Sequence, residues 1–200
     1  MKKAIFSVTL CLLISNVASA QSNVVGLPPL PAGCVKPSQA QAIPWSYIAE
    51  SNIQWSKRIW RDIDTRNPGN SLIANAPTNA RLASIMVEGF LSGAYKAYSG
   101  ANDRFTTPLS QKEFIDLLAA GSGGFDPALV TRYRIKEDWL FLEKEKSMVV
   151  RIVGIAPLMK VKRTDGTLTE QPAFWLYYPD TRTYFAQRAI VSKDHPYIFN

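Results

Sequence analysis

Residues 132–179 constrain the fold more than any other part of this chain. β-Branched side chains dominate residues 149–155, and beyond Pro157 apolar and basic residues alternate as far as Thr164. This alternation is typical of a strand that has one face in a core and the other in water. An earlier strand is expected at residues 135–141, where Ile, Trp and Phe alternate with charged side chains. The segment therefore predicts neighbouring strands of one sheet.

The chain after this strand is expected to turn back on itself. Asp165 and Gly166 predict a tight hairpin turn, because both residue types adopt the positive φ angles that such turns require. We expect the returning strand at residues 174–178, with Pro179 at its end. Residues 181–190 predict a helical turn followed by one more strand.

The N-terminus predicts export and a single folded domain. Residues 1–20 carry two lysines, an apolar run and small residues before a cleavage site between Ala20 and Gln21, which is the pattern of a signal peptide. Residues 21–43 are rich in proline and predict a flexible or partner-bound arm. Residues 44–200 suffice for one α+β domain, and no later apolar run is long enough to span a membrane directly.

Residues 51–64 predict an amphipathic first helix. Its apolar stripe consists of Trp55, Ile59 and Ile63, which recur every four positions, with Trp60 beside them. In one interpretation this stripe only packs into the core. In the other, the helix presents Trp60 with neighbouring charged residues as a contact surface, since Trp and Arg dominate association energies.

Two more helices are expected before the sheet. Residues 79–98 keep the helical period, and a row of small residues at Gly89, Gly93 and Ala97 would let another element approach closely. Ser110 begins a capping box at the start of the third helix, which a glycine at position 121 would end. The predicted fold class is α+β, with N-terminal helices packed on a largely antiparallel C-terminal sheet.

The residue types needed for catalysis are scarce. His195 is the single histidine, and Cys34 lies in the proline-rich arm without an evident base. We therefore expect no enzyme, no metal site and no cofactor. Two pairs of carboxylates remain available, Asp62 with Asp64 and Glu137 with Asp138. Because a glycosidase needs only two carboxylates, the alternative function is a small periplasmic glycan-binding protein or a carboxylate-dependent peptidoglycan hydrolase.

The charge is moderately basic. The chain has a formal net charge of +7 at pH 7, and its basic residues are interleaved with acidic ones. Interleaved charges are typical of a solvated surface rather than of a patch for a polyanion. Since export is also expected, nucleic acid is not an expected partner.

Four blocks of this sequence together resemble the gliding-motility protein family GldN and its relative PorN. They are residues 55–64 (WSKRIWRDID), 135–141 (IKEDWLF), 151–157 (RIVGIAP) and 174–179 (FWLYYP). The blocks stand in the family's order, and the resemblance covers Asn52 to Arg182.

The resemblance implies a periplasmic scaffold of the type IX secretion and gliding-motility machinery. Members of this family are thought to assemble into a ring with a GldK- or PorK-like outer-membrane lipoprotein. They are also thought to contact the periplasmic domain of a GldM- or PorM-like motor protein. The implied location is the periplasm, with peripheral association to the outer membrane.

The residues expected to bind partners or to carry the family motif come from these blocks, together with Arg182 at the end of the resemblance. They are Trp55, Trp60, Arg61, Asp62, Asp64, Arg151, Trp175, Tyr177, Tyr178 and Arg182. Arg151 lies among apolar residues of a predicted central strand, so burial would require a carboxylate beside it. We expect that carboxylate to be Asp62, Asp64, Glu137 or Asp138.

Overall fold

The computed structural model describes residues 41–70, 73, 81–119, 125–191 and 196–198, and side chains only as far as residue 188. All of them belong to one compact unit, Gly33–Asn200. The predicted signal peptide with Ala20 and Gln21, most of the predicted arm, the predicted helix stop at position 121 and His195 lie outside the described residues.

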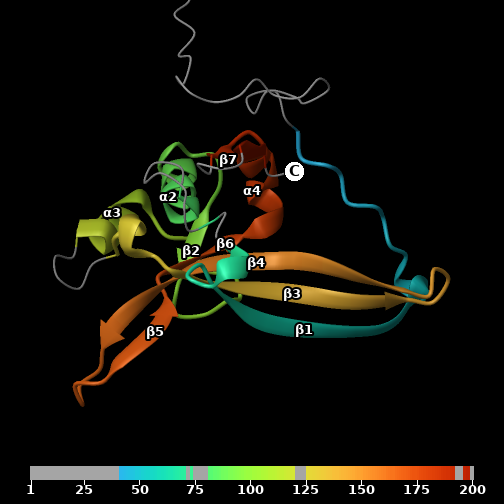
Figure 1. Ribbon diagram of the computed structural model, residues 1–200, viewed down its shortest axis with the longest axis horizontal. Helices are drawn as coiled ribbons and strands as arrows, with labels where there is room; N and C mark the ends of the chain where they lie inside the picture. Colours follow the sequence, from blue (N-terminus) through green and yellow to red (C-terminus); the bar gives the residue numbers. More distant parts are fainter. Residues whose placement is uncertain (1–40, 71–72, 74–80, 120–124, 192–195, 199–200) are drawn as a thin grey trace, which may run out of the picture. The chain divides into compact units, whose positions relative to one another are not determined.

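The described elements make an α+β fold (Figure 1). The strands are β1 (Ile53–Asp64), β2 (Ala97–Ser99), β3 (Arg132–Leu142), β4 (Ser147–Lys162), β5 (Leu168–Pro172), β6 (Phe174–Tyr177), β7 (Ala189–Val191) and β8 (Pro196–Ile198). The α-helices are α2 (Leu82–Leu91), α3 (Gln111–Ala119) and α4 (Tyr178–Ala186). Short 3₁₀ turns cover Glu50–Asn52, Pro68–Asn70 and Pro127–Leu129. Among the described residues, no helix is long and apolar enough to cross a bilayer.

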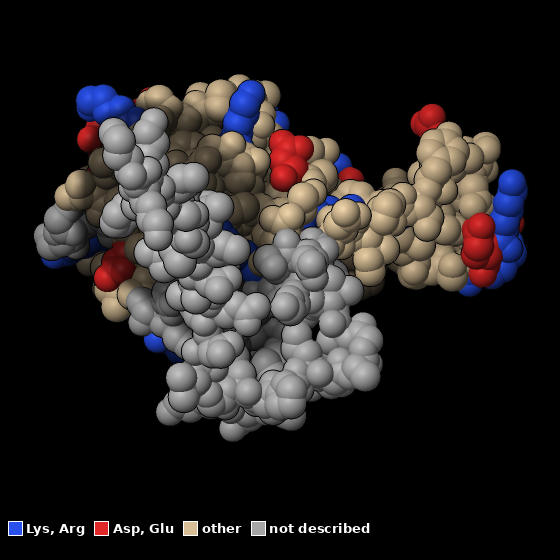
Figure 2. Space-filling model, turned by 90° about the horizontal axis from the view of Figure 1, so that it is seen from above, with Lys and Arg blue, Asp and Glu red and all other residues tan. Residues whose placement is uncertain are grey.

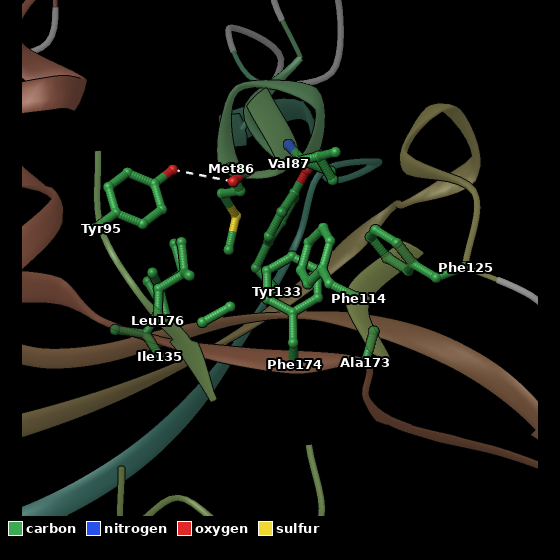
Figure 3. Close-up of a cluster of buried hydrophobic side chains, with 13 residues drawn as sticks. Met86, Val87, Tyr95, Phe114, Phe125, Tyr133, Ile135, Ala173, Phe174 and Leu176 are labelled. Atoms are coloured by element: carbon green, nitrogen blue, oxygen red, sulfur yellow. Dashed lines mark hydrogen bonds between the residues drawn. The ribbon is translucent and has the colours of Figure 1, made fainter. Parts of the chain in front are cut away.

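The main sheet is antiparallel and has the strand order β1-β3-β4-β6-β2, with β5 paired to β4 outside this path. Figure 1 shows α2, α3 and α4 on one side of this sheet. The core lies between the helices and the sheet, where Met86 from α2, Phe114 from α3, and Phe174 and Leu176 from β6 are buried (Figure 3). Burying each of these side chains stabilises the fold by about 1.5–3 kcal/mol.

The C-terminal predictions are largely confirmed. β3 and β4 form the expected pair, and the turn at Asp165-Gly166 joins β4 to β5, with φ of Gly166 at +83°. The returning segment differs from the single strand that was predicted, because Ala173 divides it into β5 and β6. Pro179 does not simply end a strand, since it lies in the first turn of α4, where a helix tolerates proline. A helix followed by β7 is the arrangement expected for residues 181–190.

The predicted first helix is wrong, because residues 53–64 form the edge strand β1. A spacing of four residues is even, so Trp55, Ile59 and Ile63 share one face of a strand as well as one face of a helix. The strand forms rather than the helix, because the segment pairs with β3 along eleven residue pairs. The N-terminal half therefore contributes a strand to the sheet as well as helices to its cover.

The second helix is shorter than predicted and its glycines have other roles. Helix α2 ends at Leu91, and Gly93 follows it with φ of +75°, a conformation that favours glycine. Ala97 belongs to β2. Gly89 does admit a close neighbour, which is the ring of Tyr95 rather than the sheet. The Tyr95 hydroxyl donates to the Met86 carbonyl oxygen at 3.0 Å (Figure 3).

The third helix begins as predicted. The Ser110 backbone and hydroxyl both donate to the Glu113 carboxylate, at 2.8 and 2.7 Å, and the Glu113 amide donates back to Ser110 Oγ. This reciprocal capping box satisfies backbone donors that a helix start would otherwise leave free.

Replacing Gly89 by alanine is expected to destabilise the protein, although alanine favours helices. A methyl group at Gly89 would lie 2.2 Å from the Tyr95 hydroxyl oxygen, so the buried ring would have to move. We expect Gly89→Ala to lower the free energy of unfolding by about 1–3 kcal/mol, measured by urea denaturation. Gly69→Ala is the control, since nothing lies within 4 Å of that position. Equal midpoints for both variants would contradict the packing described for Tyr95.

Candidate functional site

One row of residues crosses four strands on the sheet face that is turned away from the helices. Ile135 points into the core, so the next residue, Lys136, points to the opposite face. In register with Lys136 lie Trp60 of β1 and Gly154 of β4, and Gly154 in turn is opposite Tyr177 of β6. The strand register therefore places an aromatic residue at each end of the row.

The loop of residues 101–107 covers the middle of this row. The Trp60 indole N–H donates to Asp103 Oδ2 at 2.6 Å. The Lys136 ammonium donates to the Asp103 carbonyl oxygen at 2.7 Å and lies 3.2 Å from Asp103 Oδ2. Asp103 thereby joins the loop to two strands of the sheet.

Phe105 fills the place where Gly154 has no side chain. A Cβ atom on Gly154 would lie 2.6 Å from Phe105 Cζ. The Phe105 ring centroid is 5.6 Å from that of Tyr98, 6.2 Å from that of Trp175 and 5.3 Å from that of Tyr177. Phe105 has φ of 57°, an uncommon conformation for a bulky residue, so the ring contacts must offset a local backbone cost of about 1–3 kcal/mol.

We call the five rings Trp60, Tyr98, Phe105, Trp175 and Tyr177 the aromatic face. Lys136 lies beneath it and is only 6% exposed, with its ammonium 5.1 Å from the Phe105 centroid and 5.8 Å from the Trp60 centroid. Trp60 is 50% exposed and Tyr177 36%. The face therefore presents two accessible rings on a support fixed by a buried charge.

The environment of Asp103 favours its ionised form. Burial alone raises the pKa of Asp103, but the hydrogen bonds from Trp60 and Lys136, with the positive charge of Lys136, together hold the pKa below its usual range. The carboxylate is therefore available as an acceptor for both partners at neutral pH.

Arginine–carboxylate pairs connect β1 with β3 beside the aromatic face. Arg58 contacts both oxygens of Asp138 at 2.6 Å, and Arg134 contacts those of Asp62 at 2.7 and 2.9 Å. On the opposite face of the sheet, Glu137 is buried and accepts from Arg61 at 2.6 Å and from the Trp139 indole at 3.0 Å. These pairs fix the register of the edge strand.

The carboxylates considered for catalysis are therefore engaged by arginines. The hydrogen bond from Arg134 lowers the pKa of Asp62, and the hydrogen bonds from Arg66 hold the pKa of Asp64 far below its usual range. A general acid needs a raised pKa instead. Within the described part of the chain, no three His, Cys, Asp or Glu side chains are grouped so that they could hold a metal ion.

The structure brings together only some of the predicted site residues. Trp60, Trp175 and Tyr177 meet in the aromatic face, whereas Trp55 and Arg61 lie on the opposite face of β1. Tyr178 starts α4 and packs towards Phe185. Asp62 and Asp64 belong to the arginine pairs, and Arg182 contacts the ring of Trp45.

The predicted carboxylate partner of Arg151 is not found among the described residues. Asp138 is opposite Arg151 in the strand register, but its carboxylate binds Arg58. Arg151 instead donates to the Ser46 carbonyl oxygen at 2.9 Å and lies over the Trp45 ring. The prediction failed because Arg151 is only half-buried and reaches a segment that the sequence assigned to no element.

Sequence reasoning also missed Asp103, Phe105 and Lys136. Gly154 was an available signal, since a glycine within a β-branched strand often marks a close approach by another group. The loop that makes this approach has no pattern of its own in the sequence.

The fold and the site together are those of an α+β protein with a strand-built surface of rings and paired charges. The comparison with known families shows where this chain belongs. The family model described as "Gliding motility associated protein GldN" matches residues 48–197, which is most of the chain, so this chain belongs to the GldN family of gliding-motility associated proteins. No curated protein sequence matches the chain.

The Asp103 carboxylate predicts a pH-dependent contribution to stability. Its pKa in the folded state is below the value of about 3.9 for an unfolded chain, so its contribution is present above that value and is lost as the pH falls through the folded pKa. We expect Asp103→Asn to lower the free energy of unfolding by roughly 1–2 kcal/mol at pH 7. This difference from wild type should shrink towards pH 3 in urea denaturation.

Asp116→Asn is the matched control, because Asp116 pairs with Lys112 on the exposed side of α3. It should change stability little at either pH. A deficit of Asp103→Asn that stays constant from pH 7 to pH 3 would rule out the ionised contact.

Proposed function

We propose that this gliding-motility associated protein is a non-catalytic scaffold or adaptor subunit of the type IX protein secretion and gliding-motility machinery. The observation that carries the proposal is the aromatic face. Two accessible rings, Trp60 and Tyr177, rest there on the buried Lys136 and the packed ring of Phe105. Trp and Tyr dominate the binding energy of protein interfaces, above all where their neighbours hold them rigidly.

The electrostatic surroundings support a protein partner rather than a polyanion. Acidic and basic side chains are paired beside the aromatic face, where Arg58 binds Asp138 and Arg134 binds Asp62. The opposite, helix-covered side of the molecule, which Figure 2 shows, also carries acidic and basic side chains beside one another. Mixed charges around apolar rings are the composition of a protein interface, with a polar rim around an apolar centre.

The proposed partners follow from the family. One is a GldK- or PorK-like outer-membrane lipoprotein, and the other is the periplasmic domain of a GldM- or PorM-like motor protein. Self-association in a ring with the lipoprotein belongs to the same proposal. The corresponding location is the periplasm, at the inner side of the outer membrane.

The alternative of a carboxylate-dependent hydrolase receives less support. It requires one carboxyl group that stays protonated and one that is free to act. The pairing of Asp62 with Arg134 and of Asp138 with Arg58 opposes both requirements. We therefore favour binding over catalysis.

The proposal predicts that the aromatic face carries affinity for the lipoprotein. We expect Trp60→Ala and Tyr177→Ala each to weaken binding to the purified GldK-like lipoprotein of the same cell by about tenfold or more. Tyr47→Ala is the control, because Tyr47 is 90% exposed and lies outside the aromatic face. Co-elution on a sizing column and interferometry give the measurement.

Circular dichroism of each variant would separate loss of binding from loss of folding. Wild-type protein that fails to co-elute with the lipoprotein would contradict the proposed partner. Unchanged affinity of both folded ring variants would contradict the proposed surface.

A further inference from the structure

A second candidate site lies where the end of the proline-rich arm meets the domain. The segment 41–49 has no regular secondary structure and leads to β1. Its Trp45 contacts two arginines, with the Arg182 guanidinium 4.5 Å and that of Arg151 4.9 Å from the ring centroid. Arg182 comes from α4 and Arg151 from β4, so the indole connects a helix and a strand to the segment that leads to β1.

The two arginines are satisfied differently from those of β1 and β3. Arg151 donates to the Ser46 carbonyl oxygen at 2.9 Å, and Arg182 donates to the Ile43 carbonyl oxygen. In the part of the chain that the structure describes, no Asp or Glu lies within ion-pair distance of either guanidinium. Each guanidinium has five N–H donors, so backbone carbonyls use only part of their capacity.

The two charges also repel each other. Burial, followed by the positive charge of Arg182, lowers the pKa of Arg151 below its ordinary value. Elsewhere in the sheet, arginines such as Arg58 and Arg134 have a raised pKa because a carboxylate pairs with them. An anion placed beside Arg151 and Arg182 would remove the repulsion and engage donors in a planar, bidentate geometry.

A hollow of about 200 Å³ adjoins Arg182 and Trp45. Most of its wall is apolar and comes from Ile43, Val150, Ile152, Phe185 and Ala186. An apolar hollow beside cationic donors fits a group that combines an anionic head with an apolar stem. An inorganic anion would leave this hollow unfilled.

We propose that Arg151 and Arg182 bind a carboxylate of a partner protein, an Asp or Glu side chain whose apolar neighbour enters the hollow beside Trp45. This site shares no residue with the aromatic face, so it stands or falls independently of the proposed function. It would give the protein a second contact, specific for an acidic and apolar segment.

N-acetylphenylalanine is a suitable probe, because it carries one carboxylate on an apolar stem. Its uncharged amide is the matched control ligand. The full chain, labelled with ¹⁵N, is titrated with each compound, and the arginine Nε–H and tryptophan indole signals are followed by NMR. We expect the acid to bind with a dissociation constant on the order of 1 mM, to shift the signals of Arg151, Arg182 and Trp45, and to bind at least tenfold more tightly than the amide.

Two variants and a charge-matched control locate the site. Arg151→Gln and Arg182→Gln should each weaken binding of the acid at least tenfold. Arg163→Gln removes the same charge just beyond the far end of β4, which is Lys162, and should leave binding unchanged. Urea denaturation midpoints of all three variants establish that they are folded. If Arg151→Gln or Arg182→Gln unfolds, the wild-type titration locates the site instead, through shifts confined to Arg151, Arg182 and Trp45.

Three results would overturn the proposal. The acid and its amide could bind equally well, which would exclude recognition of the carboxylate. The arginine signals could stay unchanged on addition of the acid. Finally, vesicles of phosphatidylglycerol could bind in an Arg151-dependent manner while the acid does not, which would assign the two arginines to a lipid phosphate instead.

Discussion

The ammonium group of Lys136 determines how the outer face of this sheet is built. It lies at the centre of the sheet, 6% exposed, where an unpaired charge would cost several kcal/mol. Asp103 supplies the compensating charge and a carbonyl oxygen, so the loop of residues 101–107 must lie across the sheet. Once the loop is held there, Phe105 reaches the space above Gly154 and contacts Tyr177. The aromatic face is therefore a consequence of satisfying one buried lysine.

The edge strand completes this arrangement only in one register. A shift of β1 by a single residue would turn Trp60 to the helix side and bring its neighbours to the outer face. The arginine–carboxylate pairs oppose such a shift, because Arg58 with Asp138 and Arg134 with Asp62 require the observed alignment. Together the charged pairs and the Trp60–Asp103 hydrogen bond make an exposed edge strand specific in its pairing. Charged side chains on this strand also oppose unspecific pairing with other strands.

Local patterns in the sequence were sufficient for elements whose partners lie nearby in the chain. The β3–β4 pair, the turn at Gly166 and the capped start of α3 depend on neighbouring residues, and all three were predicted. Strand β1 depends on β3, which lies far along the chain, and its four-residue spacing fits helix and strand alike. Residue type alone was enough to predict contact residues at Trp60, Trp175 and Tyr177, because Trp and Tyr are common in binding surfaces. The contacts of Trp175 and Tyr177 with Phe105, and of Trp60 with Asp103, could not be predicted. The position of the loop that makes them is set by a buried charge, which a linear pattern does not reveal.

We propose that this GldN-family protein meets its partner through the face that Lys136 supports. Hydrogen–deuterium exchange, measured by mass spectrometry on the full chain with and without the purified GldK-like lipoprotein, tests this most directly. We expect slower exchange in the complex for peptides that cover β1 around Trp60, the loop of residues 101–107 and β6, with little change in α2 and α3. Protection confined to the helices, with the loop and β1 unchanged, would contradict it.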